Sequence, residues 1–191
     1  TGFIGKALTR HFAETDYQLK VLIHPGGKSP DLPRGIPVEA AVSGLNDTRG
    51  LKAALVDVDI VYHLASQENL GARGNLLETD IQGTKNLVEA AEKSGVKRFF
   101  YLSHLGADRA SAYPVMTAKA IAEDHIQKSS LEYTIIRSGI VFGPNDHLTL
   151  PLSGLLQSIP VIFPLPDEGD TLLQPIWIED LANILTWSID N

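Results

Sequence analysis

Short apolar runs rich in β-branched residues alternate along this chain with stretches in which apolar residues recur every three or four positions. The runs predict buried strands, and the stretches predict amphipathic helices. The predicted strands are Leu19–His24, Val38–Val42, Ile60–Leu64, Arg98–Ser103 and Tyr133–Arg137. The predicted helices are Ile4–Glu14, Thr48–Val56, Ile81–Ser94, Tyr113–Lys128 and Glu179–Ile189. This alternation is typical of a parallel sheet covered by helices, so we predict a doubly wound, Rossmann-type α/β fold.

The chain opens on Thr1-Gly2-Phe3-Ile4-Gly5, which has the spacing of the second half of a glycine-rich turn entering a helix. Such a turn follows a strand, and no strand pattern precedes it. A sheet without this central first strand would leave a row of backbone groups unpaired, at a cost of about 1 kcal/mol or more for each group. We therefore expect a fragment, or a chain whose leading residues are missing.

The alternation of predicted strands and helices becomes irregular after Arg137. We predict that residues 1–145 form the Rossmann domain and that residues 146–191 add an irregular substrate-side segment and the final helix of the same domain. The longest uncharged run, residues 148–166, is long enough to suggest a membrane span. Its four prolines would leave backbone groups unsatisfied in lipid. We predict a short helix followed by an apolar loop, and no transmembrane segment.

Composition narrows the possible functions. The 191 residues suit one domain, and the net charge of −7 without a basic cluster argues against a nucleic-acid partner. The chain has no cysteine, which excludes disulfides, thiolate catalysis and zinc–thiolate sites. No metal site is predicted, a reducing compartment such as the cytoplasm is expected, and an oligomer is possible.

Several stretches, taken in order, resemble the extended and atypical short-chain dehydrogenase/reductases. The similarity is closest to the NmrA-like branch and to the 39-kilodalton accessory subunits of respiratory complex I. The stretches are TGFIG (1–5), DVDIVYHLA (57–65), DIQGTKNLVEAA (80–91), RFFYLSHLGAD (98–108), LEYTIIRSGIVFGPND (131–146) and QPIWIEDLANIL (174–185). The resemblance implies a Rossmann fold that binds a nicotinamide dinucleotide.

Glycines before a helix let the backbone approach a pyrophosphate, which the helix N-terminus also attracts. The resemblance extends the cofactor site from this turn over further positions along the chain. The predicted cofactor-binding residues are Gly2, Phe3, Ile4, Gly5, His24, Lys28, Leu45, Leu64, Ala65, Lys119, Ser138, Gly139 and Ile140. An NAD site usually has an acid about 20 residues after the turn, but here none occurs before Asp31. Because His24 and Lys28 could face a 2′-phosphate, NADP(H) is favoured over NAD(H); a solvated loop is the alternative.

The family's reaction uses a tyrosine, a lysine four residues later, and a serine or threonine on the fifth strand. Lys119 matches the lysine and Ser103 the hydroxyl, but Val115 stands where the tyrosine belongs. Tyr113 lies six residues before Lys119 and is followed by Pro114, so we expect it at or before the helix start, off the face of Lys119. Lys119, Ser103 and Tyr113 are the candidate catalytic residues.

Four other positions have alternative interpretations. His104, after Ser103, is either an acid–base group or a solvated loop residue. His63 is interpreted as a packed, hydrogen-bonded histidine, and Arg137 as the partner of a carboxylate such as Asp146 or Asp180. Ser138 stands where relatives have proline, so it either adds a hydrogen-bond donor beside the nicotinamide or is merely tolerated.

Two observations bear on the substrate and the activity. No arginine or lysine lies between Asp146 and Asp170, so the substrate-side wall suits an apolar small molecule or a protein surface better than a sugar nucleotide. Loss of an acid–base group usually costs about 100- to 10,000-fold in rate. We therefore favour a slow or specialised oxidoreductase acting on an apolar carbonyl or quinone. The alternatives are a non-catalytic redox sensor or complex-assembly subunit and, third, a sugar-nucleotide epimerase or dehydratase.

Overall fold

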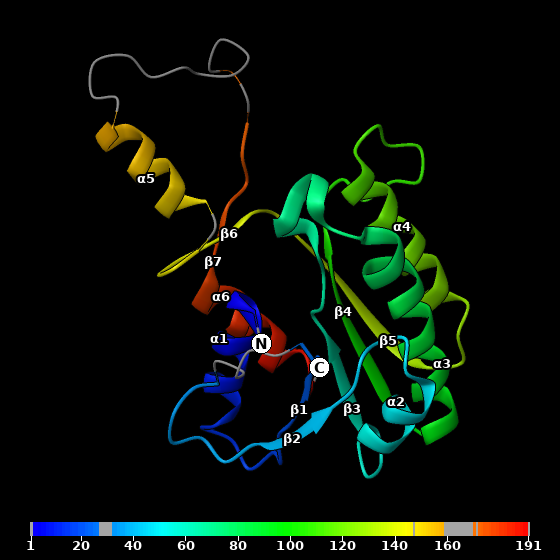
Figure 1. The fold of residues 1–191 in the computed structure, drawn as a ribbon. Coiled ribbons are helices and arrows are strands. Elements are labelled where there is room, and N and C mark those ends of the chain that lie inside the picture. The colour runs from blue at the N-terminus through cyan, green and yellow to red at the C-terminus, as the bar shows by residue number, and fades with distance from the viewer. Residues whose placement is uncertain (1, 27–31, 147, 159–169, 171, 191) are drawn as a thin grey trace.

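The computed structural model describes residues 2–26, 32–146, 148–158, 170 and 172–190 (Figure 1). Its strands are β1 (Lys20–Ile23), β2 (Glu39–Val42), β3 (Ile60–His63), β4 (Arg98–His104), β5 (Glu132–Ser138), β6 (Val141–Phe142) and β7 (Ile176–Trp177). Its α-helices are α1 (Phe3–Phe12), α2 (Thr48–Ala54), α3 (Thr84–Ser94), α4 (Pro114–Gln127), α5 (Thr149–Ser158) and α6 (Ile178–Trp187). A 3-10 segment, η1 (Glu68–Arg73), and a π-helical turn, η2 (Leu77–Gly83), lie between β3 and α3.

All strand pairs are parallel, as the alternating pattern predicts. Strands β3, β4 and β5 form a three-stranded sheet with β4 in the middle, whereas β1 pairs with β2 and β6 pairs with β7 in separate two-stranded sheets. Helices α2, α3 and α4 lie on one side of β3–β5, and α1 and α6 lie on the other (Figure 1). The fold is therefore the predicted Rossmann-type α/β arrangement with its sheet divided between β1 and β3.

The central strand β4 shows why this sequence forms a two-sided core. Its residues from Phe99 to Ser103 are all buried, and they point alternately to the two faces of the sheet. Phe99 and Tyr101 pack with the residues of α2, α3 and α4, whereas Leu102 packs with those of α1 and α6. The ring of Phe100 stacks on Tyr62 of β3, with centroids 4.4 Å apart. A strand covered on both faces requires a continuous apolar run, which this segment provides.

The ends of three helices follow from local sequence signals. The Asp47 side chain accepts hydrogen bonds from the backbone N–H groups of Arg49 and Gly50 and so caps α2. Helix α3 ends at Gly95, which has a left-handed φ of 75°. Pro114 is the first residue of α4, where its missing N–H costs nothing. The predicted stop at Gly95 and the predicted start of α4 after Tyr113 are both confirmed.

The segment after β5 is less regular, as its sequence suggests. A short helix, α5, occurs within residues 148–166 as predicted, and none of its residues is buried. The predicted apolar loop falls on residues 159–169, which lie outside the described residues. The short strands β6 and β7 had no sequence signal. In the described part of the chain, no helix is long and apolar enough to cross a membrane.

Arg137 pairs with a carboxylate, as predicted, but the carboxylate is a different one from the two that the sequence suggested. Arg137 pairs with neither Asp146 nor Asp180; it forms a two-pronged contact with Glu123 of α4, with Nε 2.9 Å from Oε1 and Nη2 2.6 Å from Oε2. Glu123 is buried, so it needs this cation. A partner 14 positions away on a neighbouring helix leaves no periodic signal in the sequence.

Asp146 instead organises the turn before α5. Its buried carboxylate accepts hydrogen bonds from the backbone N–H groups of Gly143, Leu148 and Thr149 and from the Thr149 hydroxyl. Burial raises the pKa of Asp146, but these hydrogen bonds outweigh it and lower the pKa to about 2. The ionised carboxylate therefore stabilises the folded state.

This pKa predicts a pH-dependent loss of stability. A carboxyl whose pKa is depressed by folding stabilises the protein above its unfolded pKa of about 3.9, and that contribution is lost as the pH falls towards 2. We expect Asp146→Asn to lower the free energy of unfolding by about 2 kcal/mol at pH 7 and by much less at pH 2.5. Urea unfolding at both pH values measures this difference. The exposed Glu14→Gln variant is the control, and an equal loss for Asp146→Asn at both pH values would contradict the assignment.

Candidate functional site

A cavity of about 2140 Å³ opens where the loops follow the carboxyl ends of the strands. Open α/β sheets bind ligands in this position. The lining includes every predicted site residue that the structure describes: Gly2, Phe3, Ile4, Gly5, His24, Leu45, Leu64, Ala65, Ser103, Tyr113, Lys119, Ser138, Gly139 and Ile140. Lys28 lies outside the described residues. The fold thus brings these residues to one cavity, and their binding roles remain predictions.

The cavity is larger than the 300–1,000 Å³ typical of ligand pockets. It continues between β1 and β3. There its lining consists of residues 19–22, in and just before β1, and of residues 58–60 and 62, in and just before β3. The volume therefore includes the space between these two described sheets as well as the part lined by the predicted site residues.

The glycine turn leads directly into α1. Gly2 is the N-cap residue, with an extended backbone, and a Cβ atom at Gly2 would meet nothing within 4 Å. Within the described chain, no side chain caps α1, and its first turn has no acid. The first N–H groups of the helix therefore border open space, an arrangement that suits a phosphate group.

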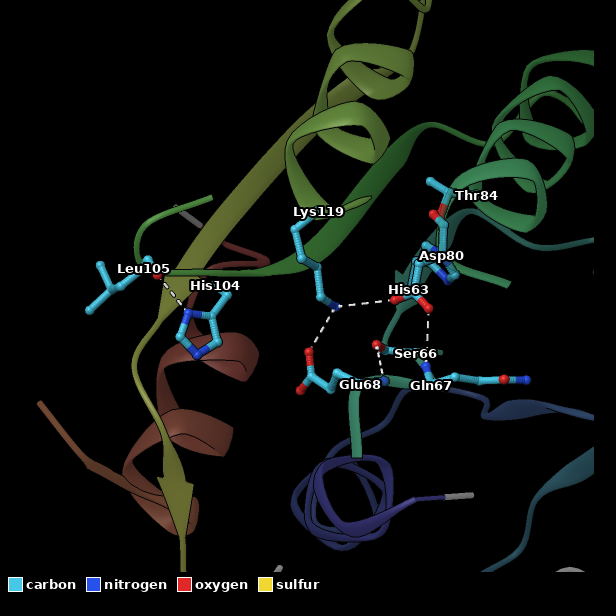
Figure 2. Close-up of polar contacts among 9 residues, drawn as sticks. All are labelled: His63, Ser66, Gln67, Glu68, Asp80, Thr84, His104, Leu105 and Lys119. Atoms are coloured by element: carbon cyan, nitrogen blue, oxygen red, sulfur yellow. Dashed lines mark hydrogen bonds and ion pairs between the residues drawn. The ribbon is translucent and has the colours of Figure 1, made fainter. Parts of the chain in front are cut away.

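Lys119 lies at the centre of a charge cluster in which Lys119 and Asp80 are buried and Glu68 is exposed (Figure 2). The residue is only 5% exposed, and its Nζ lies 3.4 Å from Glu68 Oε2 and 3.8 Å from Asp80 Oδ1. Nζ also lies 5.5 Å from the ring centroid of Tyr101. The ammonium is therefore held in place by two carboxylates and an aromatic face.

Glu68 and Asp80 were missed by the sequence reasoning. Asp80 begins the DIQGTKNL stretch, which carries part of the family resemblance. A carboxylate at a buried helical position could have indicated that Asp80 needs a cationic partner. Glu68 begins η1, a segment without hydrophobic periodicity, so no sequence pattern predicted that its carboxylate lies beside Lys119.

A hydrogen-bonded chain connects this cluster to His63. The Thr84 hydroxyl donates to the Asp80 carbonyl at 2.6 Å, so it accepts from Nε2 of His63 at 2.8 Å. Burial, followed by the nearby Lys119, lowers the pKa of His63 to about 3. His63 is therefore neutral, and its interpretation as a packed, hydrogen-bonded histidine is confirmed.

The tyrosine–lysine pair of the family is absent from this site. Tyr113 is the N-cap residue of α4 and is 72% exposed, and Val115 occupies the position four residues before Lys119. Ser103 is 3% exposed, and its Oγ has no hydrogen-bond partner in the described part of the structure although it lines the cavity. Such a buried, unpaired hydroxyl suits a site that completes its hydrogen bonds with a ligand.

Leu45, one of the predicted cofactor-binding residues, is held in place by the helices beside it. Its backbone carbonyl accepts a hydrogen bond from Nδ2 of Asn86 at 3.0 Å. The Leu45 side chain packs against Gly83, where an added Cβ would lie 2.8 Å from Leu45 Cδ1. Leu45 is thus anchored by η2 and α3 beneath the cavity.

The sequence model of a family described as NAD(P)H-binding matches residues 1–147. The mitochondrial NADH dehydrogenase (ubiquinone) 1 alpha subcomplex subunit 9 of Arabidopsis thaliana is 26% identical over 190 residues, which cover 95% of this chain and 46% of the plant protein. Ceramide reductase of Caulobacter vibrioides is 27% identical over 182 residues, 95% of this chain and 56% of the reductase. The chain spans about half the length of these two curated relatives.

Solved structures show the same fold. The UDP-glucose 4-epimerase of Thermus thermophilus, crystallised with NAD, superposes with a TM-score of 0.80 at 21% identity, covering 100% of this chain and 72% of the epimerase. The open helix terminus at Gly2 suits the phosphates of a dinucleotide. The chain belongs to the NAD(P)H-binding family whose sequence model matches residues 1–147, and it is similar to a mitochondrial complex I subunit over 95% of its length.

Proposed function

We propose that this chain is the nucleotide-binding part of an oxidoreductase that reduces an apolar carbonyl or a quinone-type acceptor with NADP(H). One observation carries the proposal: the glycine turn at α1, the buried Lys119 and the unpaired Ser103 hydroxyl all face one cavity. The ceramide reductase of Caulobacter vibrioides and a protein named putative dihydroflavonol 4-reductase from Synechocystis, 30% identical over 109 residues, support a reductase.

Each part of the site has a role in this proposal. The N–H groups of the first turn of α1 hold the pyrophosphate, and Lys119 holds the nicotinamide ribose. Residues 138–140, at the end of β5 and directly after it, cover one face of the nicotinamide, and the Ser103 hydroxyl donates to the substrate oxygen. The bound reduced nicotinamide supplies the hydride. In the sequence, His24 and Lys28 occur after the second predicted strand and no acid occurs there before Asp31, which favours NADP(H) over NAD(H).

The apolar character of the segment beyond β5 supports an apolar substrate. Helix α5 exposes Leu150, Leu152, Leu155 and Leu156, and the segment between Asp146 and Asp170 contains no arginine or lysine. A diphosphate would require cations there. The proposed acceptor is therefore a carbonyl or quinone carried on an apolar body.

A second candidate function is a nucleotide-binding subunit or assembly factor without turnover. Two observations favour it. Tyr113 is exposed and lies six residues before Lys119 instead of four, so it does not form the family's tyrosine–lysine pair, and α5 has no buried residue. Relatives named as a complex I subunit and as photosystem II assembly factor Ycf39 of Cyanophora paradoxa, 24% identical over 137 residues, support this alternative.

Nucleotide titration separates these candidates. We expect the full chain to bind NADPH more tightly than NADH, as measured by nicotinamide fluorescence, and to oxidise bound NADPH when a short-chain quinone or an aromatic ketone is added. Binding without oxidation over a broad panel of acceptors would support the second candidate. If neither nucleotide binds, both are wrong.

A variant at Gly2 tests where the phosphates bind. An aspartate at an N-cap stabilises a helix, but here its carboxylate would occupy the N–H groups and repel the pyrophosphate. We expect Gly2→Asp to weaken NADPH binding at least about tenfold, a change of about 1.4 kcal/mol, while the thermal unfolding midpoint holds or rises. Gly2→Asn is the uncharged control. Equal affinities of Gly2→Asp and wild type would place the phosphates elsewhere.

A further inference from the structure

We propose that His104 is the acid–base residue of this site and that its Nε2 exchanges a proton with the carbonyl or hydroxyl oxygen of the substrate. This inference rests on the proposed oxidoreductase function. It answers a question that the site leaves open, namely which group handles the proton when Val115 replaces the family tyrosine.

His104 lies beside the other candidate catalytic groups. It is the last residue of β4, directly after Ser103, and it pairs in register with Ser138 of β5. His104 lines the cavity together with Ser103, Lys119 and Ser138. A substrate oxygen bound at the Ser103 hydroxyl would therefore lie in the same cavity as the His104 ring.

The hydrogen bonding of the ring fixes its tautomer. Nδ1 of His104 lies 2.6 Å from the carbonyl oxygen of Leu105. A carbonyl oxygen only accepts, so Nδ1 carries a proton, and in the neutral ring Nε2 keeps a lone pair. Figure 2 shows Nε2 on the edge of the ring that faces away from Leu105. Within the described residues Nε2 has no hydrogen-bond partner, and the half-buried ring can exchange protons with solvent.

The neighbouring titratable groups are unsuited to this role. Nε2 of His63 already donates to Thr84, and burial holds His63 in its neutral form. Burial, together with Asp80 and other acids nearby, raises the pKa of Tyr101 well above its usual range. Nζ of Lys119 already contacts the carboxylates of Glu68 and Asp80. His24, the third histidine of the described cavity lining, follows β1 rather than β4.

The proposed proton step is balanced. During reduction, the protonated ring of His104 gives its Nε2 proton to the carbonyl oxygen as the hydride reaches the carbonyl carbon. The C=O π bond breaks, and C–H and O–H bonds form. The carbonyl is reduced to an alcohol, the nicotinamide is oxidised, and the neutral ring takes a proton from solvent. In the reverse direction the neutral Nε2 accepts the hydroxyl proton.

One test needs no turnover. In the nucleotide-free chain, ¹⁵N NMR of the imidazole nitrogens distinguishes the two neutral tautomers, and His104→Asn assigns the signal by its loss. We expect the neutral His104 ring to carry its proton on Nδ1 and not on Nε2. A neutral ring protonated on Nε2 would overturn the proposal, whatever the activity of the protein.

The second test measures hydride transfer. His104→Asn keeps a donor for the Leu105 carbonyl and removes the proton at the Nε2 position. We expect NADPH affinity to stay within about twofold and single-turnover oxidation of NADPH by a quinone or ketone to fall about 100- to 10,000-fold. His125→Asn, on α4 outside the cavity lining, is the matched control.

The outcomes separate the two proposals. Wild-type turnover with an equally active His104→Asn variant would overturn the role of His104 and leave the oxidoreductase function intact. A wild-type protein that binds NADPH without oxidising it would overturn the oxidoreductase function, and the catalytic role of His104 with it. Turnover in wild type and His125→Asn but not in His104→Asn supports both.

Discussion

Replacing Lys119 by methionine is expected to destabilise the protein by about 3–5 kcal/mol, because it leaves a buried carboxylate without its cation. Asp80 is 1% exposed, and Lys119 supplies the positive charge nearest to its Oδ1 in the described structure. That oxygen has no described hydrogen-bond partner, while Oδ2 accepts from the Gln67 backbone. Urea unfolding measures the loss of stability.

A double-mutant cycle isolates this interaction. If the loss of stability comes from the unpaired Asp80 carboxylate, Asp80→Asn in the Lys119→Met background should recover most of the lost free energy of unfolding. Glu68→Gln is the contrasting variant: Glu68 is largely solvated, so its ion pair with Lys119 should contribute no more than about 1 kcal/mol. Strictly additive effects of Lys119→Met and Asp80→Asn would show that the cluster is not coupled.

The second large effect is expected at the centre of the sheet. Phe99 is 0% exposed and packs among the residues of α2, α3 and α4, so Phe99→Ala should cost about 3–5 kcal/mol through lost burial and the cavity left behind. Chemical denaturation measures the change. Tyr133, its partner in register on β5, is 41% exposed, and Tyr133→Ala should cost far less. Equal losses at both positions would mean that β4 does not form the core.

The regular part of this fold could be predicted because its signals are local. The apolar run of β4 indicates a strand covered on both faces, and Gly95 and Pro114 mark helix ends through their own backbone preferences. The cavity residues were also predictable as a set, since parallel strands place their carboxyl ends at one edge of a sheet.

The charge contacts could not be predicted for a different reason. Glu123 reaches Arg137 across the packing of α4 on β5, and Asp80 reaches Lys119 from the preceding helical segment. Such contacts depend on the rotation and position of each helix against the sheet. The spacing of hydrophobic residues restricts this rotation and position only loosely. The π-helical turn at η2 shifts the chain further from the regular helix that the sequence predicts from Ile81 onwards.

A dinucleotide bound at the predicted positions would contact both of the larger described sheets, because His24 follows β1 and Lys119 lies on α4, which packs on β4 and β5. A ligand that binds only the folded chain stabilises it by linkage, and ligand at 100 times its Kd adds about 2.7 kcal/mol to the free energy of unfolding. We therefore expect occupancy of the site to raise the resistance of both sheets to unfolding.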